Sequence, residues 1–406
     1  MAYIKRTAER LIKKLVSTFK IVLVTGPRQV GKSTMLKYLY GEEYEYITFD
    51  DINELSLAKS DAKLFFINHP GKLIIDEVQL CPEIFIEIKR IVDSTDEVGR
   101  FILTGSQTFS LMQNVSESLA GRVGIMELKP LSTQEIIGNS EVESFKPSVT
   151  AIKEKETAVD YSELWNIIHR GAMPELYHRP DMDWEMYYAS YLSTFIQRDV
   201  RQLAAIQDLN IFNQFISVLA ARTSQEVNYA SIAQEVGVDQ KTIKSWIGIL
   251  EASGMVYIIN TFSNNQLKRV TKAPVLYFFD TGLVAYLGRW TTPQTLQNGA
   301  FAGAILENYC VSEILKSYSN QGKSHYPIYF YRDKDKKEID LIIEDSGVLY
   351  PIEIKHSASP NAKMAKHMAV LEKAEGFKVG IKTILAQVEK NYLIAEDILV
   401  YAINRL

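Results

Sequence analysis

The sequence predicts an α/β protein with a parallel sheet near its amino-terminal end. Continuous apolar runs indicate buried strands at residues 21–25, 72–76 and 100–104, and a shorter run covers 46–50. Helical stretches separate these runs, and strands that alternate with helices favour a parallel sheet covered on both faces. Helix and strand patterns alternate again from about residue 299, so we expect a second α/β domain at the carboxyl end.

The bulk composition is that of an ordinary globular protein. The chain has 406 residues, 47% hydrophobic and 23% charged, with a formal net charge of −4. This charge argues against a general polybasic nucleic-acid binder, so any DNA contact requires a local basic patch. The chain has two distant cysteines and no apolar run of bilayer length, and its first residues lack the apolar core and cleavage site that a signal peptide would show. These features predict a cytoplasmic protein with no membrane partner.

A nucleotide-binding motif follows the first predicted strand. The pattern G-x-x-x-x-G-K-[ST] is matched by Gly26, Pro27, Arg28, Gln29, Val30, Gly31, Lys32 and Ser33, with Thr34 after them. The glycines let backbone N–H groups surround phosphate oxygens, and the following helix points its positive end at them. Lys32 is expected to reach the β- and γ-phosphates of ATP, and Ser33 to offer its hydroxyl to Mg²⁺.

Two carboxylates stand at the end of the strand predicted at residues 72–76. Asp76 can hold Mg²⁺ through water from this position, and Glu77 beside it can polarise the attacking water. The alternative is an acidic pair at a strand end that simply faces solvent.

Polar residues also follow the strand predicted at residues 100–104. Thr104 or Ser106 could sense the γ-phosphate there, and the alternative is a plain strand-to-helix turn. Arg122 could stabilise charge in the transition state, within its own chain or in a neighbouring subunit of a homo-oligomer. The alternative for Arg122 is a surface salt bridge.

Five sequence blocks together resemble a known group of ATPases. They are the P-loop and the runs Ile-Asp-Glu-Val-Gln, Leu-Thr-Gly-Ser-Gln, Leu-Ala-Gly-Arg and Leu-Lys-Pro-Leu-Ser. This set is similar to that of the AAA-type ATPases of bacteria and archaea that carry a C-terminal domain of unknown function numbered 4143. Blocks at 171–175 and 191–200 extend the resemblance over nearly the whole chain, although Ala172 replaces the family's usual second glycine. The resemblance implies an ATPase core.

Residues 223–290 predict a winged helix. One short helix ends at Gly237, a second begins after Asp239 as its N-cap, and two apolar runs then form the wing. The basic residues that could contact DNA phosphates are Lys241, Lys244, Lys268, Arg269 and Lys272. The alternative is a module that packs against the ATPase core or a neighbouring molecule.

A pattern of carboxylates and lysine marks the last domain. Asp340 lies near one strand start, and Glu353 and Lys355 lie two residues apart on the next strand, so they share a face. The arrangement resembles the PD-(D/E)xK pattern of the restriction-endonuclease-like fold of Holliday-junction resolvases. Asp340 and Glu353 can share Mg²⁺, with Glu307 as a further carboxylate, while Lys355 positions water or stabilises phosphate charge. The alternative is a fold of this kind that no longer cleaves.

The predicted organisation has four parts. They are an AAA-type P-loop core over 1–135, a linker and helical lid over 136–222, a winged helix over 223–290 and a nuclease-like domain over 291–406. We expect an ATPase that acts on or with DNA, with metal-dependent cleavage in the last domain as a further possibility. The alternative is a signalling or scaffold ATPase whose last two domains bind protein partners.

Overall fold

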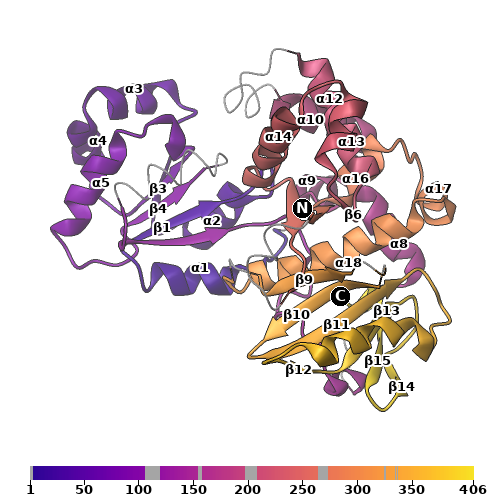
Figure 1. The fold of residues 1–406 in the computed structure, drawn as a ribbon. Helices are drawn as coiled ribbons and strands as arrows, with labels where there is room; N and C mark the ends of the chain where they lie inside the picture. The colour runs from indigo at the N-terminus through magenta and orange to yellow at the C-terminus, as the bar shows by residue number, and fades with distance from the viewer. Residues whose placement is uncertain are drawn as a thin grey trace.

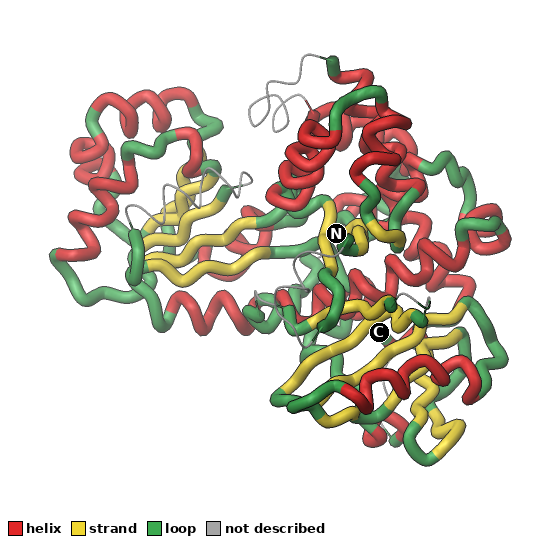
Figure 2. Tube along the Cα trace, viewed as in Figure 1, coloured by secondary structure: helices red, strands yellow, loops and turns green. Residues whose placement is uncertain are grey.

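The computed structural model describes residues 3–105, 119–153, 158–196, 208–263, 273–323, 326–333, 335 and 337–406. A P-loop core lies on one side of the molecule, with a largely helical region and a carboxyl-terminal sheet domain on the other (Figure 1). Figure 2 shows the strands of the core and of the last domain as two separate sheets. Within the part of the chain that is described, no helix is long and apolar enough to cross a membrane.

A parallel five-stranded sheet forms the core, in the order β2-β3-β4-β1-β5. Its strands are β1 (Ile21–Thr25), β2 (Glu45–Thr48), β3 (Leu73–Asp76), β4 (Phe101–Thr104) and β5 (Val123–Glu127). Every residue of β1, β3 and β4 is buried, which is why these strands read as unbroken apolar runs. The four predicted strands are confirmed, each shifted by no more than about two residues.

Helices cover both faces of this sheet. They are α1 (Glu9–Val16), α2 (Lys32–Tyr40), α3 (Ile52–Ser60), α4 (Ala62–Asn68) and α5 (Ile84–Asp93), and the short turn η1 (Val78–Leu80) follows β3. Val22 and Val24 of β1 share a buried cluster with residues of α1 and α2. Ile21 and Leu23 point to the opposite face, where they share a cluster with residues of α4 and α5. The two-sided burial confirms the expected α/β architecture.

The middle of the chain is largely helical. Its elements are α7 (Thr133–Ile136), η2 (Val149–Ile152), α8 (Tyr161–Arg170), α9 (Pro174–His178), α10 (Trp184–Phe195), α12 (Leu209–Ala221), α13 (Tyr229–Val236), α14 (Gln240–Ala252), α16 (Thr281–Leu287) and α17 (Pro293–Asn298). A small sheet has the order β6-β8-β7, formed by β6 (Gln225–Glu226), β7 (Val256–Ile259) and β8 (Val275–Phe278). The two helices and the two paired apolar runs expected within residues 223–290 are thus present.

A buried carboxylate holds three helices of this region together. Asp280 accepts hydrogen bonds from the backbone of Ala172 at 3.0 Å, from the Tyr188 hydroxyl at 2.7 Å and from the backbone of Leu283 at 2.8 Å. Gly171 has φ +87°, and a Cβ there would lie 2.1 Å from the Tyr188 hydroxyl. The first glycine of this block is therefore required, whereas Ala172 contributes its backbone N–H to Asp280 and its carbonyl to Leu131, so a methyl group is tolerated there.

The last domain is built on a mixed seven-stranded sheet. The main path has the order β14-β15-β13-β11-β10-β9, and β12 pairs with β11. Its elements are α18 (Ala302–Ser319), β9 (Ile328–Arg332), β10 (Glu338–Asp345), β11 (Val348–Lys355), η4 (Ala362–Lys373), β12 (Lys378–Val379), β13 (Lys382–Ala386), β14 (Tyr392–Ala395), β15 (Ile398–Ala402) and η5 (Ile403–Arg405). The adjacent antiparallel strands β10 and β11 carry the predicted Asp and Glu-x-Lys residues.

Helix α18 joins the last domain to both other parts. The Asn308 side chain pairs with the backbone N–H and carbonyl of Phe278 on β8, at 2.7 and 2.8 Å. Lys316 donates to Glu313 and to the carbonyl of Leu131, both at 2.8 Å, and all three groups are buried. Because Leu131 belongs to the Leu-Lys-Pro-Leu-Ser block, that block is where the core docks against the last domain.

Candidate nucleotide site

The loop between β1 and α2 adopts a conformation that depends on its glycines. Gly26 has φ +135°, and a Cβ there would lie 2.2 Å from the carbonyl oxygen of Leu128. Gly31 is left-handed with φ +89° and immediately precedes α2. Gln29, at φ +61°, is also left-handed although it carries a side chain. The loop therefore wraps around the amino-terminal end of α2, where backbone N–H groups and the helix dipole favour an anion.

Lys32 lies inside this loop. Its ammonium donates to the carbonyl of Gly26 at 2.9 Å and to that of Pro27 at 2.8 Å. The residue is only 7% exposed, so its charge is shielded from solvent by the loop itself. An ammonium held among loop carbonyls can exchange them for phosphate oxygens without leaving the site.

Asp76 receives four hydrogen bonds at the end of β3. Its Oδ2 accepts from the Ser33 hydroxyl at 2.7 Å and from the Tyr46 hydroxyl at 2.5 Å. Its Oδ1 accepts from the Thr104 hydroxyl at 2.5 Å and from the backbone N–H of Glu77 at 3.1 Å. The strand order explains this convergence, because β4 lies between β1 and β3 and delivers Thr104 between the P-loop and Asp76.

These contacts keep the Asp76 carboxylate ionised. Burial by itself would raise the pKa of Asp76, but the hydroxyls of Thr104, Tyr46 and Ser33 and the charge on Lys32 outweigh it, so the pKa lies below its usual value. A carboxylate beside a serine hydroxyl is a hard-oxygen donor pair of the kind that Mg²⁺ prefers. The residues present therefore fit the Mg²⁺ site predicted for Ser33 and Asp76.

Glu77 follows Asp76 in a left-handed conformation, with φ +55°. The side-chain amide of Gln79 donates to its Oε2, and Glu77 lines the same cavity as Lys32 and Ser33. A carboxylate oriented in this way is suited to hold a water molecule near the phosphates. Ser106, the other predicted γ-phosphate sensor, lies outside the described residues, whereas Thr104 contacts Asp76.

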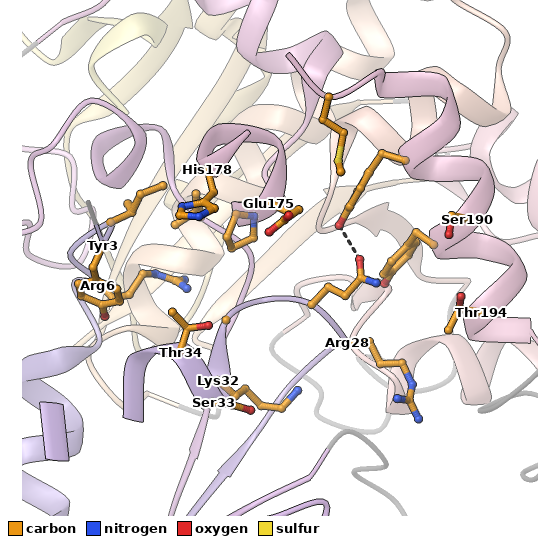
Figure 3. A pocket seen from close by; sticks show the side chains of 18 of the residues that line it. Tyr3, Arg6, Arg28, Lys32, Ser33, Thr34, Glu175, His178, Ser190 and Thr194 are labelled. Atoms are coloured by element: carbon orange, nitrogen blue, oxygen red, sulfur yellow. Dashed lines mark hydrogen bonds between the residues drawn. The ribbon is translucent and has the colours of Figure 1, made fainter. Parts of the chain in front are cut away.

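A cavity of about 1160 Å³ opens above the P-loop (Figure 3). The core lines it with the P-loop, Glu77 and the amino-terminal segment, and the helical region lines it with α9 and α10. The predicted nucleotide-binding residues that line it are Arg28, Gln29, Gly31, Lys32, Ser33 and Thr34. Figure 3 shows Glu175 and His178 of α9, and Ser190 and Thr194 of α10, across the cavity from Lys32 and Ser33.

Residues distant in sequence hold the P-loop in place. Arg6 is buried, and it donates to the carbonyl of Val30 at 2.9 Å and to that of Lys129 at 2.7 Å. The Tyr187 hydroxyl of α10 donates to the Gln29 side chain at 2.8 Å, the dashed contact in Figure 3. None of these supporting residues belongs to a nucleotide-binding motif, so sequence inspection offered no signal for them.

The structure corrects the role expected for Arg122 within its own chain. Its guanidinium donates to the Asp93 carboxylate at 2.5 and 3.1 Å. Its carbonyl accepts from the backbone of Ile21 at 3.3 Å, so Arg122 lies beside the amino-terminal end of β1. The P-loop follows the carboxyl-terminal end of β1, roughly 16 Å away by the rise of a five-residue strand. The prediction that Arg122 acts on the nucleotide of its own chain is therefore wrong. Its role in a neighbouring subunit stays a prediction.

The predicted residues of the last domain also converge. The Lys355 ammonium lies 2.6 Å from Glu353 Oε1 and 3.7 Å from Asp340 Oδ2. Asp340 also accepts from the backbone N–H of Ile354 at 2.7 Å. Burial, and then repulsion from Asp340, raises the pKa of Glu353 to about 7. Burial would lower the pKa of Lys355, but the Asp340 and Glu353 carboxylates raise it.

Glu307 joins this cluster from α18. The Tyr277 hydroxyl of β8 donates to it at 2.9 Å, and burial and then Asp340 raise the pKa of Glu307 well above its usual value. Across the residues with described positions, no group of three or more His, Cys, Asp or Glu side chains is arranged to hold a metal ion. The predicted set of Asp340, Glu353 and Glu307 is thus not a preformed three-ligand site. Nevertheless, Glu353 Oε2 is buried and has no hydrogen-bond partner among the described residues.

Relatives of this chain, each described as an uncharacterized protein, occur in mycobacteria and in Haemophilus influenzae. A protein of Mycobacterium tuberculosis and one of Mycobacterium bovis are each 27% identical over 369 residues, covering 91% of this chain and 77% of theirs. A protein of Haemophilus influenzae is 23% identical over 375 residues, covering 84% of both chains.

Solved structures show weaker similarity. A Walker-type ATPase of Pyrococcus abyssi has a TM-score of 0.43 and 14% identity, covering 70% of this chain and 96% of that one. The RuvB Holliday junction branch migration motor of Thermotoga maritima has a TM-score of 0.28 and 14% identity, covering 62% and 88%.

Family comparisons divide the chain into three segments. Residues 161–294 match a domain of unknown function, DUF8612, and residues 302–406 match another, DUF4143. Residues 18–137 match the AAA domain, and they contain the P-loop, Asp76 and the whole parallel sheet. The amino-terminal part of this chain is therefore a P-loop AAA domain, followed by two domains of unknown function.

Proposed function

We propose that this chain binds ATP with Mg²⁺ at the P-loop of residues 26–34 and hydrolyses it. The observation that carries the proposal is the meeting of Lys32, Ser33 and Asp76 at one end of the parallel sheet, beneath a cavity of about 1160 Å³. Lys32 would exchange the carbonyls of Gly26 and Pro27 for phosphate oxygens. Ser33 would bind Mg²⁺ with its hydroxyl oxygen, and Asp76 would hold the ion indirectly, through the Ser33 hydroxyl or a water molecule. The bound ion would neutralise phosphate charge.

The remaining roles follow from position. Glu77, oriented by Gln79, would accept hydrogen bonds from the attacking water and align it with the γ-phosphate. Thr104 would fix Asp76 from the neighbouring strand. The helices α9 and α10 close the other side of the cavity, where they would limit the access of water.

Glu77→Gln tests hydrolysis separately from binding. The change keeps the side-chain size but removes the charge that orients water, so MgATP should still bind while turnover falls by about 100-fold or more. Binding is measured with a fluorescent ATP analogue, and turnover by phosphate release. Glu87→Gln, at an exposed ion pair with Arg90 on α5, is the matched control and should retain turnover. Near-normal turnover in Glu77→Gln would remove Glu77 from the mechanism.

We further propose that the ATPase works with DNA through residues 223–290, read as a winged helix. Lys241 and Lys244 are exposed on α14, the helix that is expected to contact DNA phosphates. The supporting observation is that the turn after α14 lies against the P-loop: a Cβ on Gly254 would lie 2.9 Å from Pro27. Nucleotide-dependent movement of the P-loop would therefore displace α14.

A second candidate function is metal-dependent cleavage of phosphodiesters by the last domain. Support comes from Glu353 beside Asp340 and Lys355, because its Oε2 is buried and finds no hydrogen-bond partner in the described part of the chain. A divalent cation would give that oxygen a partner, and Lys355 would then be free to stabilise a phosphate. The alternative is a signalling or scaffold ATPase in which Lys355 permanently neutralises the two carboxylates and the domain binds protein.

A further inference from the structure

Tyr46 contacts Asp76 of the Ser33–Asp76 pair from the neighbouring strand. It belongs to β2, which runs parallel to β3 with Tyr46 opposite Ile74. Its hydroxyl donates to Asp76 Oδ2 at 2.5 Å, the same oxygen that accepts from Ser33. The ammonium of Lys37 lies 3.7 Å from the centre of its ring. Lys37 lies four residues after Ser33 on α2, so the two residues share one face of that helix. This face supplies the Ser33 hydroxyl that donates to Asp76 and the Lys37 ammonium that lies over the Tyr46 ring.

The four hydrogen bonds to Asp76 constrain how it can act. A carboxylate offers about four lone-pair positions, and each oxygen of Asp76 already accepts two donors. A metal could reach this carboxylate directly only by displacing a donor. The arrangement instead lets the Ser33 hydroxyl keep donating to Oδ2 while the Ser33 oxygen offers its lone pairs to the cation.

We infer that Tyr46 is a positioning residue for Mg²⁺, which fixes the Asp76 carboxylate so that the Ser33 oxygen faces the metal. The inference rests on the proposed MgATP site. Without the Tyr46 hydroxyl, Oδ2 has an open position, and the carboxylate is free to rotate or to take a water molecule. The Ser33 hydroxyl then loses its single orientation, and the site must be reorganised each time the cation binds.

The protonation states agree with this role. Burial, followed by the hydrogen bond to Asp76, raises the pKa of Tyr46 far above its usual value, so its hydroxyl remains a donor at neutral pH. The bond in turn helps to hold the pKa of Asp76 down.

Tyr46→Phe, with Tyr44→Phe as control, tests the inference. Tyr44 is buried, and its hydroxyl donates to the carbonyl of Gly99, away from Asp76. Binding of a fluorescent ATP analogue and ATP turnover are each measured in full-length protein against Mg²⁺ concentration. Tyr46→Phe should raise the half-saturating Mg²⁺ concentration in both measurements by about ten-fold, the scale of one hydrogen bond to a charged group. Tyr44→Phe should leave the Mg²⁺ requirement as in the wild type.

The outcomes separate this inference from the proposed function. If the wild type hydrolyses MgATP and Tyr46→Phe requires no more Mg²⁺ than Tyr44→Phe, Tyr46 serves only in packing and the inference is overturned. A wild-type chain that neither binds nor hydrolyses MgATP would overturn the inference and the proposed function together. Loss of thermal stability alone does not count as support, because either variant removes a buried hydrogen bond.

Discussion

Single residues in this chain are held by neighbours that are distant in sequence. Arg6 ties the amino-terminal segment to the P-loop through Val30 and Lys129, and its Nε lies 3.2 Å from Glu135. Both charged groups of that pair are buried, so losing either would leave an uncompensated charge. The shape of the nucleotide site therefore depends on side chains that take no part in its chemistry.

Gly171→Ala should destabilise the helical region sharply. The new methyl group would lie 2.1 Å from the Tyr188 hydroxyl and 2.6 Å from Asp280, at a φ of +87°. Overpacking and left-handed strain together predict a loss of about 3 kcal/mol or more. Thermal and denaturant unfolding measure it.

Gly237→Ala is the control for strain alone. Gly237 has φ +80°, but a Cβ there would meet no atom of the described residues within 4 Å, so we expect a loss of about 1 kcal/mol. Equal losses in the two variants would show that the contacts around Asp280 contribute nothing beyond backbone strain.

At the residue scale, the sequence predicted the site residues that belong to a known motif or stand at a strand end. Lys32, Ser33 and Asp76 could be named because strand ends in a parallel sheet meet at one edge. Tyr46 could not, since its contact with Asp76 depends on which strand lies beside β3. Arg122 was misplaced because the strand after it, β5, was not predicted. This edge strand has alternating burial, so it leaves no continuous apolar run in the sequence.

At the scale of elements, α14 relates the expected DNA-binding surface to the P-loop. Its exposed face carries Lys241 and Lys244, and the chain just beyond it packs against Pro27 of the P-loop. The sequence predicted this helix from its N-cap and apolar spacing, and Asp239 indeed accepts from the backbone of Thr242 at 2.9 Å. Its contact with the P-loop could not be predicted, because it depends on domain packing. Lys268, Arg269 and Lys272, the other predicted DNA contacts, lie outside the described residues.

Replacing Lys241 and Lys244 together by Ala should weaken DNA binding. Each phosphate contact releases condensed counterion, so the slope of log affinity against log salt should become shallower by about two. Fluorescence anisotropy with duplex DNA at several salt concentrations measures both affinity and slope.

The matched control removes two lysines elsewhere. Lys13 and Lys14 are exposed on α1, and their joint replacement by Ala changes net charge equally. If both double variants bind DNA alike, α14 is not the DNA-binding element and faces a protein instead.

At the scale of the whole molecule, the three regions are joined by α18. This helix binds the core through Leu131 and Thr133 and binds β8 through Asn308. It also carries Glu307, whose partner Tyr277 comes from β8. One helix thus contacts the core, β8 and the carboxylate cluster of the last domain. No local sequence pattern reports its contacts with the core, because they span more than 150 residues.

Divalent metal should stabilise the last domain if it carries a metal site. Binding to the folded state raises the melting temperature by mass action. Because the pKa of Glu353 is about 7, metal competes with a proton there, so Mg²⁺ or Mn²⁺ should give a larger shift at pH 8 than at pH 6. Asp340→Ala should abolish the shift and any cleavage of duplex or branched DNA.

Asp345→Ala provides the control on the same strand, since Asp345 pairs with Lys146 at the surface. This variant should keep the metal-dependent shift. If metal fails to shift the wild type at pH 8 and no substrate is cut, Lys355 already neutralises the cluster and the domain serves for binding.

The central claim is that Lys32 holds the phosphates of ATP, and equilibrium binding of MgATP to Lys32→Ala tests it most directly. Losing a charge-assisted contact to the β- and γ-phosphates should weaken affinity by about 100-fold. Lys89→Ala, which removes an exposed charge on α5, should bind as the wild type does. Affinity in Lys32→Ala equal to that of the wild type would contradict the account.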